Sequence, residues 1–268
     1  MIARALSFGC VAAAYERFRP GYPDELVDAV LAYSRRPVAT ALELGAGTGK
    51  ATRAFAARGI ALTATDPDAA MLAELRKHLP PEVVTVRAGL EDLQSTSTYD
   101  LVFAAASLHW TAAQGRWRRV AALLRPDGTF ASFGGQMSLA DAALEAAVRD
   151  ARSPFLADDG LTWLDETSAD SPMQWPGNEL AQHNDFTDVR QVTIERRWTI
   201  SASEYVGHLS TVSAYLELPT PIREQALERI LAVLPGHVTV AADLVLHLAR
   251  FTSPQGAAQV AGSGLLLC

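Results

Sequence analysis

A glycine loop, Gly45-Ala46-Gly47-Thr48-Gly49, constrains the fold of this chain more than any other feature. It follows the short apolar run 40–42 and Glu43-Leu44, and it precedes an alanine-rich stretch, residues 50–58, with helical character. The loop is therefore expected where a buried strand turns into a helix. At that position α/β folds bind small ligands through exposed backbone N–H groups.

An acidic residue follows the loop at the end of the next expected strand. Asp66 comes at the end of a second apolar run, residues 60–65. A carboxylate at the end of the second strand can accept hydrogen bonds from both hydroxyls of a ribose, so loop and acid together predict a nucleoside-cofactor site. Asp66 could instead cap the helix expected after Pro67, and both roles can hold together.

The glycine spacing helps to identify the nucleoside. Dinucleotide enzymes usually carry G-x-G-x-x-G, whereas this chain has G-x-G-x-G preceded by Glu43. A glutamate at the mouth of the loop would repel a pyrophosphate but would suit an ammonium group, such as that of the methionine part of S-adenosylmethionine. An NAD-type oxidoreductase remains the alternative, as does a tight turn that binds nothing.

Composition narrows the class of protein. The 268 residues carry a formal net charge of −7 and no long basic run, which argues against nucleic acid as a partner. No apolar stretch reaches membrane-spanning length, and the first residues lack a convincing signal-peptide core, so no membrane partner is expected. The two cysteines, Cys10 and Cys268, fit a reducing compartment. A cytoplasmic location is therefore predicted.

Strand and helix patterns alternate through the first half of the chain. This alternation predicts an α/β fold with a doubly wound, mostly parallel sheet and helices on both faces. The expected strands are 39–44, 61–65, 83–87, 99–104 and 129–133, and the expected helices are 23–33, 50–58, 69–79 and 114–124.

The pattern changes after Gly135. We expect a helix at 139–149, loops and short helices at 153–184, a strand at 189–199, helices at 203–218 and 221–234, and a final strand at 238–251. The resulting division has five parts: a lid and first helix (1–35), an α/β core (36–135), a substrate-cap insertion (136–188), a segment completing the sheet (189–254) and a flexible tail (255–268).

Five motifs between residues 8 and 133 together resemble the class I S-adenosylmethionine-dependent methyltransferases, and more closely their type 11 group with trans-aconitate methyltransferase-like proteins. In chain order they are Phe8-Gly9 with Tyr15 and Arg19-Pro20-Gly21-Tyr22-Pro23; residues 43–50; Asp66-Pro67 with Met71-Leu72; Leu90-Glu91-Asp92-Leu93; and His109-Trp110 with residues 124–128. The family often carries Gln where this chain has Ala106.

The resemblance implies a Rossmann-like seven-stranded sheet with its last strand antiparallel, under a cap of helices and loops. It implies methyl transfer from S-adenosylmethionine, which leaves S-adenosylhomocysteine, to an O, N or C nucleophile of a small molecule such as a carboxylate or secondary metabolite. We expect a monomer or a homodimer. A protein of this fold that binds the cofactor without catalysis is a further alternative.

The resemblance also assigns cofactor contacts by position. Glu43 and the loop would face the methionine part, Asp66 the ribose, Met71 the adenine ring, and Glu91 or Asp92 the adenine amino group. The N-terminal lid would supply Tyr15, Arg19 and Tyr22. The full set of expected cofactor contacts is Tyr15, Arg19, Glu43, Gly45, Ala46, Gly47, Thr48, Gly49, Asp66, Pro67, Met71, Leu90, Glu91, Asp92, Ala104 and Ala105.

Five residues are expected to contact the acceptor: Tyr22, His109, Trp110, Tyr205 and Tyr215. His109 follows the fourth strand, and its ordinary pKa suits a general base near neutral pH. The alternative is a structural histidine packed beside Trp110, because methyl transfer often needs no base. Core packing is likewise the alternative for Tyr205 and Tyr215. No Cys/His cluster has metal-ligand spacing, so no metal is expected.

Overall fold

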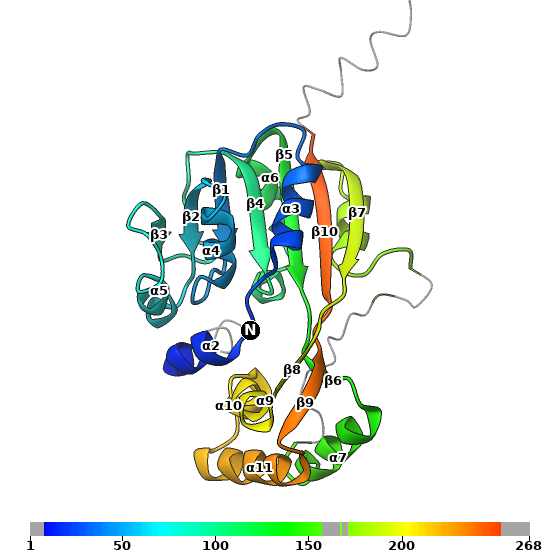
Figure 1. Ribbon diagram of the computed structural model, residues 1–268. Helices are drawn as coiled ribbons and strands as arrows, with labels where there is room; N and C mark the ends of the chain where they lie inside the picture. Colours follow the sequence, from blue (N-terminus) through cyan, green and yellow to red (C-terminus); the bar gives the residue numbers. More distant parts are fainter. Residues whose placement is uncertain (1–7, 157–166, 168–170, 253–268) are drawn as a thin grey trace, which may run out of the picture.

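A seven-stranded sheet forms the upper half of the computed structural model, which describes residues 8–156, 167 and 171–252 (Figure 1). The strand order is β3-β2-β1-β4-β5-β10-β7, with parallel pairing from β3 to β5. The last strand, β10, is antiparallel to both neighbours. The expected fold class is therefore confirmed. The strands are β1 (Thr40–Leu44), β2 (Ala61–Thr65), β3 (Val84–Val86), β4 (Tyr99–Ala105), β5 (Leu124–Gly134), β7 (Phe186–Ile194) and β10 (Leu244–Phe251).

Helices cover both faces of this sheet. On one face, α3 (Asp24–Tyr33) and α4 (Lys50–Ala56) pack their apolar side chains against Phe103, Phe133 and Leu246. On the other face, α6 (Arg116–Ala122) and α8 (Gly177–Gln182) contribute Val120 and Leu180 to a second core. Helix α5 (Ala69–Leu75) packs beside β2, with Asp68 as its N-cap. The central parallel strands β1 and β4 are buried along nearly their whole length, as doubly wound sheets require, whereas the edge strand β3 is partly exposed.

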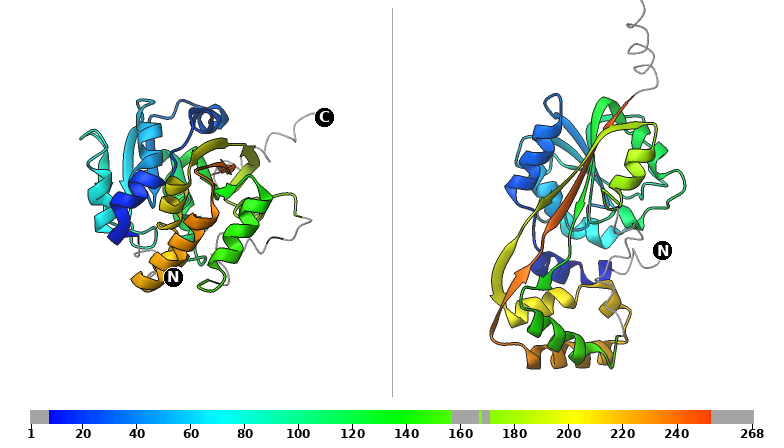
Figure 2. Two further views of the ribbon diagram at one scale, coloured as in Figure 1. Left: turned by 60° about the horizontal axis from the view of Figure 1, so that its bottom comes forward. Right: turned by 90° about the vertical axis from the view of Figure 1, so that its right-hand side faces the viewer.

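A smaller lobe lies below the sheet and has its own three-stranded antiparallel sheet (Figure 1). Its strands are β6 (Ser138–Leu139), β8 (Arg197–Ser201) and β9 (His237–Ala241). Four helices complete its apolar core: α7 (Ala142–Arg152), α9 (Ala202–Leu209), α10 (Ser213–Leu216) and α11 (Thr220–Val233). The strands that connect the two lobes run almost continuously from one sheet into the other (Figure 2).

Three expectations for the second half of the chain were wrong. The strand expected at 189–199 is two strands, β7 and β8, in different sheets, and that expected at 238–251 is likewise β9 and β10. The helix expected at 203–218 is interrupted between α9 and α10, where the Ser210 and Thr211 hydroxyls donate to the carbonyls of Gly207 and His208. Such side-chain bonds to the backbone compete with helix continuation.

One further expectation needs adjustment. The helix expected at 139–149 begins later, at Ala142, because Asp141 accepts the N–H groups of Ala143 and Leu144 as its N-cap. The region 153–184, expected to hold loops and short helices, contains the short helix α8 and lies partly outside the described residues. The tail 255–268 lies wholly outside them. The five-part division of the chain stays a prediction.

The N-terminal segment lies between the two lobes. A short 3-10 turn, η1 (Gly9–Val11), leads into α2 (Ala12–Phe18), which packs against α9 of the lower lobe and beside α5 of the upper one (Figures 1 and 2). The carboxyl ends of the parallel strands face this segment. This is the edge at which ligands bind in open α/β sheets.

Candidate functional site

The glycine loop joins β1 to α4 with a backbone that favours glycine. Gly45, Gly47 and Gly49 all have positive φ angles, of 68°, 56° and 85°. A Cβ atom at Gly45 would lie 2.6 Å from the Cβ of Ser107, so no side chain fits there. Nothing lies within 4 Å of the corresponding position at Gly47. The loop therefore leaves open backbone at Gly47, to which a ligand can approach closely.

Glu43 lies beneath this loop and is 1% exposed. Its Oε2 accepts a hydrogen bond of 2.5 Å from the Thr52 hydroxyl of α4, while Oε1 has no hydrogen-bond partner. Burial, with a smaller contribution from the charge of Asp66, raises the pKa of Glu43 to about 8. The Thr48 hydroxyl is also buried without a partner. Each unsatisfied buried polar atom needs an explanation, and these two both lie at the glycine loop.

Asp66 closes the other side of the loop. Its Oδ2 accepts the Gly47 N–H and its Oδ1 accepts the Asp68 N–H, both at 2.8 Å. Burial raises its pKa to about 6, against the effect of these two hydrogen bonds. The N-cap of α5 is Asp68, so Asp66 does not have that role. Glu43, Gly47 and Asp66 thus form one polar group at the carboxyl ends of β1 and β2.

The predicted adenine contacts come from α5 and from the segment that follows β3. Met71 and Leu90 are both 4% exposed and bring apolar surface to this end of the sheet. The Glu91 carboxylate accepts the Ala112 N–H at 2.6 Å, which ties the loop after β3 to the segment after η2 (Leu108–Trp110). The remaining candidates here differ in exposure: Asp92 is exposed, Pro67 and Ala105 are half-buried, and Ala104 is buried.

His109 lies in η2, directly after β4, with its ring 4.5 Å from that of Trp110. Trp110 in turn meets Phe8 of the N-terminal segment, edge to face at 5.9 Å. Burial, and then the charge of Arg116, lower the pKa of His109 to about 3. The imidazole is therefore neutral at physiological pH but is a weak base, because a protonated ring would be poorly solvated beside a guanidinium.

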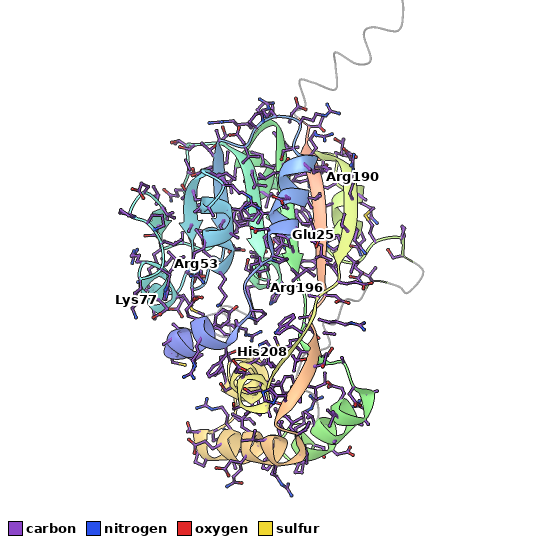
Figure 3. The ribbon with its side chains drawn as sticks, viewed as in Figure 1. Glu25, Arg53, Lys77, Arg190, Arg196 and His208 are labelled. Atoms are coloured by element: carbon purple, nitrogen blue, oxygen red, sulfur yellow. The ribbon has the colours of Figure 1, made fainter. Side chains whose placement is uncertain are left out.

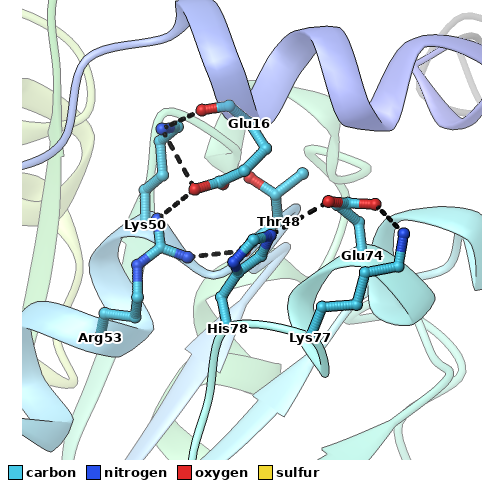
Figure 4. A network of polar contacts seen from close by, with 7 residues as sticks. All are labelled: Glu16, Thr48, Lys50, Arg53, Glu74, Lys77 and His78. Atoms are coloured by element: carbon cyan, nitrogen blue, oxygen red, sulfur yellow. Dashed lines mark hydrogen bonds and ion pairs between the residues drawn. The ribbon is translucent and has the colours of Figure 1, made fainter.

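The N-terminal segment is held to both lobes. Glu16 accepts from Arg53 at 2.7 Å and lies 3.6 Å from the ammonium group of Lys50, both of α4 (Figure 4). Arg19 donates from Nε to the Thr211 hydroxyl at 2.9 Å and from Nη2 to the Thr211 carbonyl at 2.8 Å. Burial lowers the pKa of Arg19, whose guanidinium lies over the Tyr15 ring.

Tyr22 lies deeper in the same region. Its ring meets Phe133, at the end of β5, edge to face at 5.0 Å. Burial and the nearby groups Tyr15 and Glu43 raise its pKa above the ordinary value, and the charges of Arg19 and Arg196 oppose this shift. Tyr22 is therefore close to the buried carboxyl beneath the glycine loop.

Two predicted acceptor contacts are not brought to this site. Tyr205 and Tyr215 are 1% and 0% exposed and pack in the apolar core of the lower lobe. Their surroundings fit the packing alternative rather than contact with an acceptor. Other residues at the site were missed by the sequence analysis: Thr52, Ser107 and Thr211. Thr52 alone had a sequence signal, because it lies on the helix that the loop opens.

The described residues form neither a metal centre nor a membrane span. Within residues 8–156, 167 and 171–252, no group of three His, Cys, Asp or Glu side chains is placed to hold a metal ion. The helices of the same part of the chain are all too short or too polar to cross a membrane.

The polar groups fit S-adenosylmethionine better than a dinucleotide. The unpaired Oε1 of Glu43 and the unpaired Thr48 hydroxyl suit the ammonium end of an amino acid. A pyrophosphate placed there would meet two carboxyl groups, Glu43 and Asp66, and would further disfavour their ionised forms, which burial already disfavours, whereas an ammonium group would favour them. The site thus offers nothing that favours the NAD-type alternative.

Comparisons with known proteins agree with this geometry. A family model described as a methyltransferase domain matches residues 41–128. The uncharacterized methyltransferase Rv3342 of Mycobacterium tuberculosis is 30% identical over 244 residues, which cover 88% of this chain and 89% of that protein. The trans-aconitate 2-methyltransferase of an Acidovorax species is 34% identical over 122 residues, covering 44% of this chain and 47% of that protein.

Solved structures support the fold. A structure from Anaeromyxobacter dehalogenans, assigned as a type II methyltransferase, superimposes with a TM-score of 0.58 at 23% identity, covering 88% of this chain and 99% of that one. With the full-length similarity to Rv3342 and the domain match, these findings show that the chain belongs to the S-adenosylmethionine-dependent methyltransferases.

Proposed function

We propose that the chain binds S-adenosylmethionine across the carboxyl ends of β1, β2 and β4 and methylates a small molecule held between the two lobes. The observation that carries this proposal is the buried, half-satisfied carboxyl of Glu43 beneath an open glycine loop. When bound, the cofactor supplies an electrophilic methyl group on a sulfonium. The protein's task is then to orient the two reactants and exclude water.

Each side chain has a proposed part in this task. Glu43 and Thr48 hold the ammonium end, and Asp66 holds the ribose while fixing the Gly47 amide. Met71 and Leu90 provide the apolar surface for adenine, with Glu91 at its edge. Tyr15, Arg19 and the aromatic contact between Phe8 and Trp110 close the N-terminal segment over the site.

His109 has a limited proposed part. With a pKa near 3, it accepts a proton poorly, so an acceptor that is already nucleophilic near neutral pH suits this site best. His109 and Trp110 then act as a wall of the acceptor space. Tyr22 is also proposed to contact the acceptor, because its ring lies against Phe133 at the end of β5.

The class of methyl acceptor is proposed from the net charge of the chain. A net charge of −7 and the absence of a basic run in the sequence favour a small molecule over nucleic acid. A cytoplasmic location is proposed from the sparse cysteine content, and a monomeric or homodimeric state is proposed with it.

Calorimetric titration tests the proposed function. S-adenosylmethionine and S-adenosylhomocysteine should each bind with micromolar affinity, while NADH should not bind. Release of S-adenosylhomocysteine would then be followed against a panel of small O, N and C nucleophiles. Binding of NADH in place of both adenosyl compounds would overturn the proposal, and cofactor binding without turnover of any acceptor would favour the non-catalytic alternative.

A further inference from the structure

Arg116, the first residue of α6, is a buried cation close to the carboxyl end of β4, and only 5% of it is exposed. Its Nε donates to the Thr111 hydroxyl at 2.7 Å, and its Nη2 donates to the Thr111 carbonyl at 2.8 Å. Thr111 directly follows η2, which contains His109 and Trp110. One guanidinium therefore holds both the side chain and the main chain of the residue that follows the proposed wall of the acceptor space.

The charge of Arg116 is balanced from α8. Glu179 Oε2 lies 3.5 Å from Arg116 Nη1, and the same oxygen accepts the Trp117 indole N–H at 2.9 Å. The guanidinium also lies over the rings of Trp117 and Trp175, with 5.8 Å and 5.2 Å from Cζ to the ring centroids. Contacts with a carboxylate and two aromatic rings restrict the orientation of the planar group. They therefore fix the direction in which it donates to Thr111.

Thr111 carries this constraint into the backbone of the site. Its hydroxyl donates to the Leu108 carbonyl at 2.6 Å, and its N–H donates to the same carbonyl at 3.1 Å. The next amide, that of Ala112, donates to Glu91 Oε1 at 2.6 Å. The Thr111 carbonyl and the Ala112 N–H belong to one planar peptide unit. The hydrogen bond from Arg116 to that carbonyl therefore also sets the direction of the N–H group that meets Glu91.

Glu91 is thereby oriented with one oxygen left for a ligand. Its Oε1 accepts the Ala112 N–H, while Oε2 makes no hydrogen bond to any residue that the structure describes. The proposed function puts Glu91 at the edge of the adenine ring, whose amino group is a hydrogen-bond donor. A carboxylate already held through one oxygen offers the other in a defined direction, which reduces the entropy lost when the amino group binds.

An arginine on the other face of the sheet acts on the opposite end of the proposed site. Arg53 of α4 lies 2.7 Å from Glu16 of the N-terminal segment and donates to the Thr48 carbonyl of the glycine loop at 3.3 Å (Figure 3). Its contacts therefore concern the methionine end. The contacts of Arg116 lead instead to the adenine end, so a change at Arg116 can be recognised by its effect on adenine alone.

We propose that Arg116, held in place by Glu179, is a positioning residue for the adenine end of S-adenosylmethionine. It fixes the peptide unit between Thr111 and Ala112, and the Ala112 N–H in turn orients Glu91 for the adenine amino group. In this arrangement neither Arg116 nor Glu179 contacts the cofactor. The inference rests on the proposed function and adds to it a contribution of α8, which lies outside the matched domain of residues 41–128, to the choice of cofactor.

Discrimination between two forms of the cofactor product tests this inference. Calorimetry measures the affinity of the full chain for S-adenosylhomocysteine and for S-inosylhomocysteine, in which a carbonyl oxygen replaces the adenine amino group. The ratio of the two affinities reports the contact with that amino group, whereas a general loss of structure lowers both affinities together. The variants are Glu91→Ala, Arg116→Met, Arg116→Lys, Glu179→Gln and the double variant Glu91→Ala/Arg116→Met. Arg118→Met, at an exposed position of α6, is the matched control.

The wild type should prefer S-adenosylhomocysteine by at least about tenfold, since the carbonyl oxygen of the inosyl compound would face a carboxylate. This preference should fall by at least about threefold in Arg116→Met and by less in Arg116→Lys and Glu179→Gln, because lysine keeps the charge and glutamine keeps an acceptor oxygen. Glu91→Ala should abolish the preference, and the double variant should match it. Amide exchange at Ala112 should become at least about fivefold faster in Arg116→Met and stay unchanged in Arg118→Met.

Loss of affinity by the same factor for both ligands in Arg116→Met would overturn the inference, because Arg116 would then support only the fold. Unchanged exchange at Ala112, or an effect of Arg116→Met that persists in the Glu91→Ala background, would contradict the route through Glu91. If the wild type bound both compounds equally, this inference alone would fail. If it bound neither compound, the proposed function itself would fail.

Discussion

The Gly47 amide donates a hydrogen bond of 2.8 Å to Asp66 Oδ2, so the acid that ends β2 also fixes the open point of the glycine loop. Asp66 accepts the Asp68 amide with its other oxygen. The ribose-binding and methionine-binding halves of the proposed site are therefore coupled through one side chain. A change at Asp66 should disturb both halves.

Replacement of Asp66 should accordingly weaken cofactor binding more than the loss of one contact would. Asp66→Ala removes the proposed ribose acceptor and leaves the Gly47 and Asp68 amides unpaired. We expect affinity for S-adenosylhomocysteine to fall by at least about tenfold in Asp66→Ala. Asp66→Asn should have an affinity between those of the wild type and Asp66→Ala, because one acceptor oxygen remains. Calorimetry measures this, with Asp150→Ala on the surface of α7 as control. Equal affinity of all the variants would remove Asp66 from the site.

The first half of the fold was predictable because its signals are local. The strands β1 to β5 are short apolar runs bounded by turn residues, and the helices between them have a clear apolar face. The glycine loop and Asp66 are separated by a single helix and strand, so their meeting follows from the βαβ unit alone. The loop, the acid and the alternation of strands and helices could thus be derived without tertiary information.

The second half depends on contacts that a linear pattern does not contain. The apolar runs 189–199 and 238–251 each continue from one sheet into another. The turn between β7 and β8 is held by Asp243, which accepts the Arg196 N–H, rather than by a local turn motif. Arg19 and Thr211 are 192 residues apart, and nothing in either sequence region indicates that they meet.

Glu43→Gln should change how stability depends on pH. The folded-state pKa of about 8 lies above the ordinary value of 4.5, so the folded protein holds this proton more tightly than the unfolded chain does. The free energy of unfolding therefore falls as pH rises from 4.5 to 8. Glutamine cannot ionise, so the variant should exceed the wild type by roughly 2–4 kcal/mol near pH 9 and lose that advantage towards pH 5.

Thermal denaturation of the ligand-free protein at several pH values measures this difference. Glu228→Gln, on the exposed side of α11, is the control and should show no such pH-dependent gain. If the advantage of Glu43→Gln were the same at acid and alkaline pH, the buried carboxyl would not be the titrating group.

The burial of His208 should make the stability of the protein sensitive to acid. It is 3% exposed, and burial, followed by the charge of Arg19, lowers its pKa to about 3 against a smaller opposing effect of the Phe18 backbone. Its folded-state pKa lies below the ordinary 6.5, so stability is full above pH 6.5 and falls as pH decreases towards 3. His208→Leu should therefore lose less stability between pH 7 and pH 5 than the wild type does.

The expected size is a few degrees in Tm at pH 5, because 1 kcal/mol shifts Tm by about 2–4 °C in a chain of this length. His237→Leu, at the exposed start of β9, provides the matched control. NMR of the imidazole protons adds a direct check, since the His208 ring should stay neutral down to about pH 4. Titration of His208 near pH 6.5 would contradict the prediction.

Arg19→Met should release the N-terminal segment from the lower lobe. The guanidinium donates to the hydroxyl and the carbonyl of Thr211, and it covers the Tyr15 ring. Loss of both hydrogen bonds leaves the carbonyl of a buried residue without this donor, at a cost of about 1–3 kcal/mol. Amide hydrogen exchange within α2 should become at least about fivefold faster, and affinity for S-adenosylhomocysteine should fall with it.

Arg17→Met is the matched control, because Arg17 is exposed on the same helix and only lies over the Phe18 ring. It should leave both exchange and affinity unchanged. A Thr211→Val variant separates the two hydrogen bonds, since it removes the hydroxyl and retains the carbonyl, so its exchange rate should fall between those of wild type and Arg19→Met. Faster exchange with unchanged affinity would show that the segment is anchored here but does not close over the cofactor.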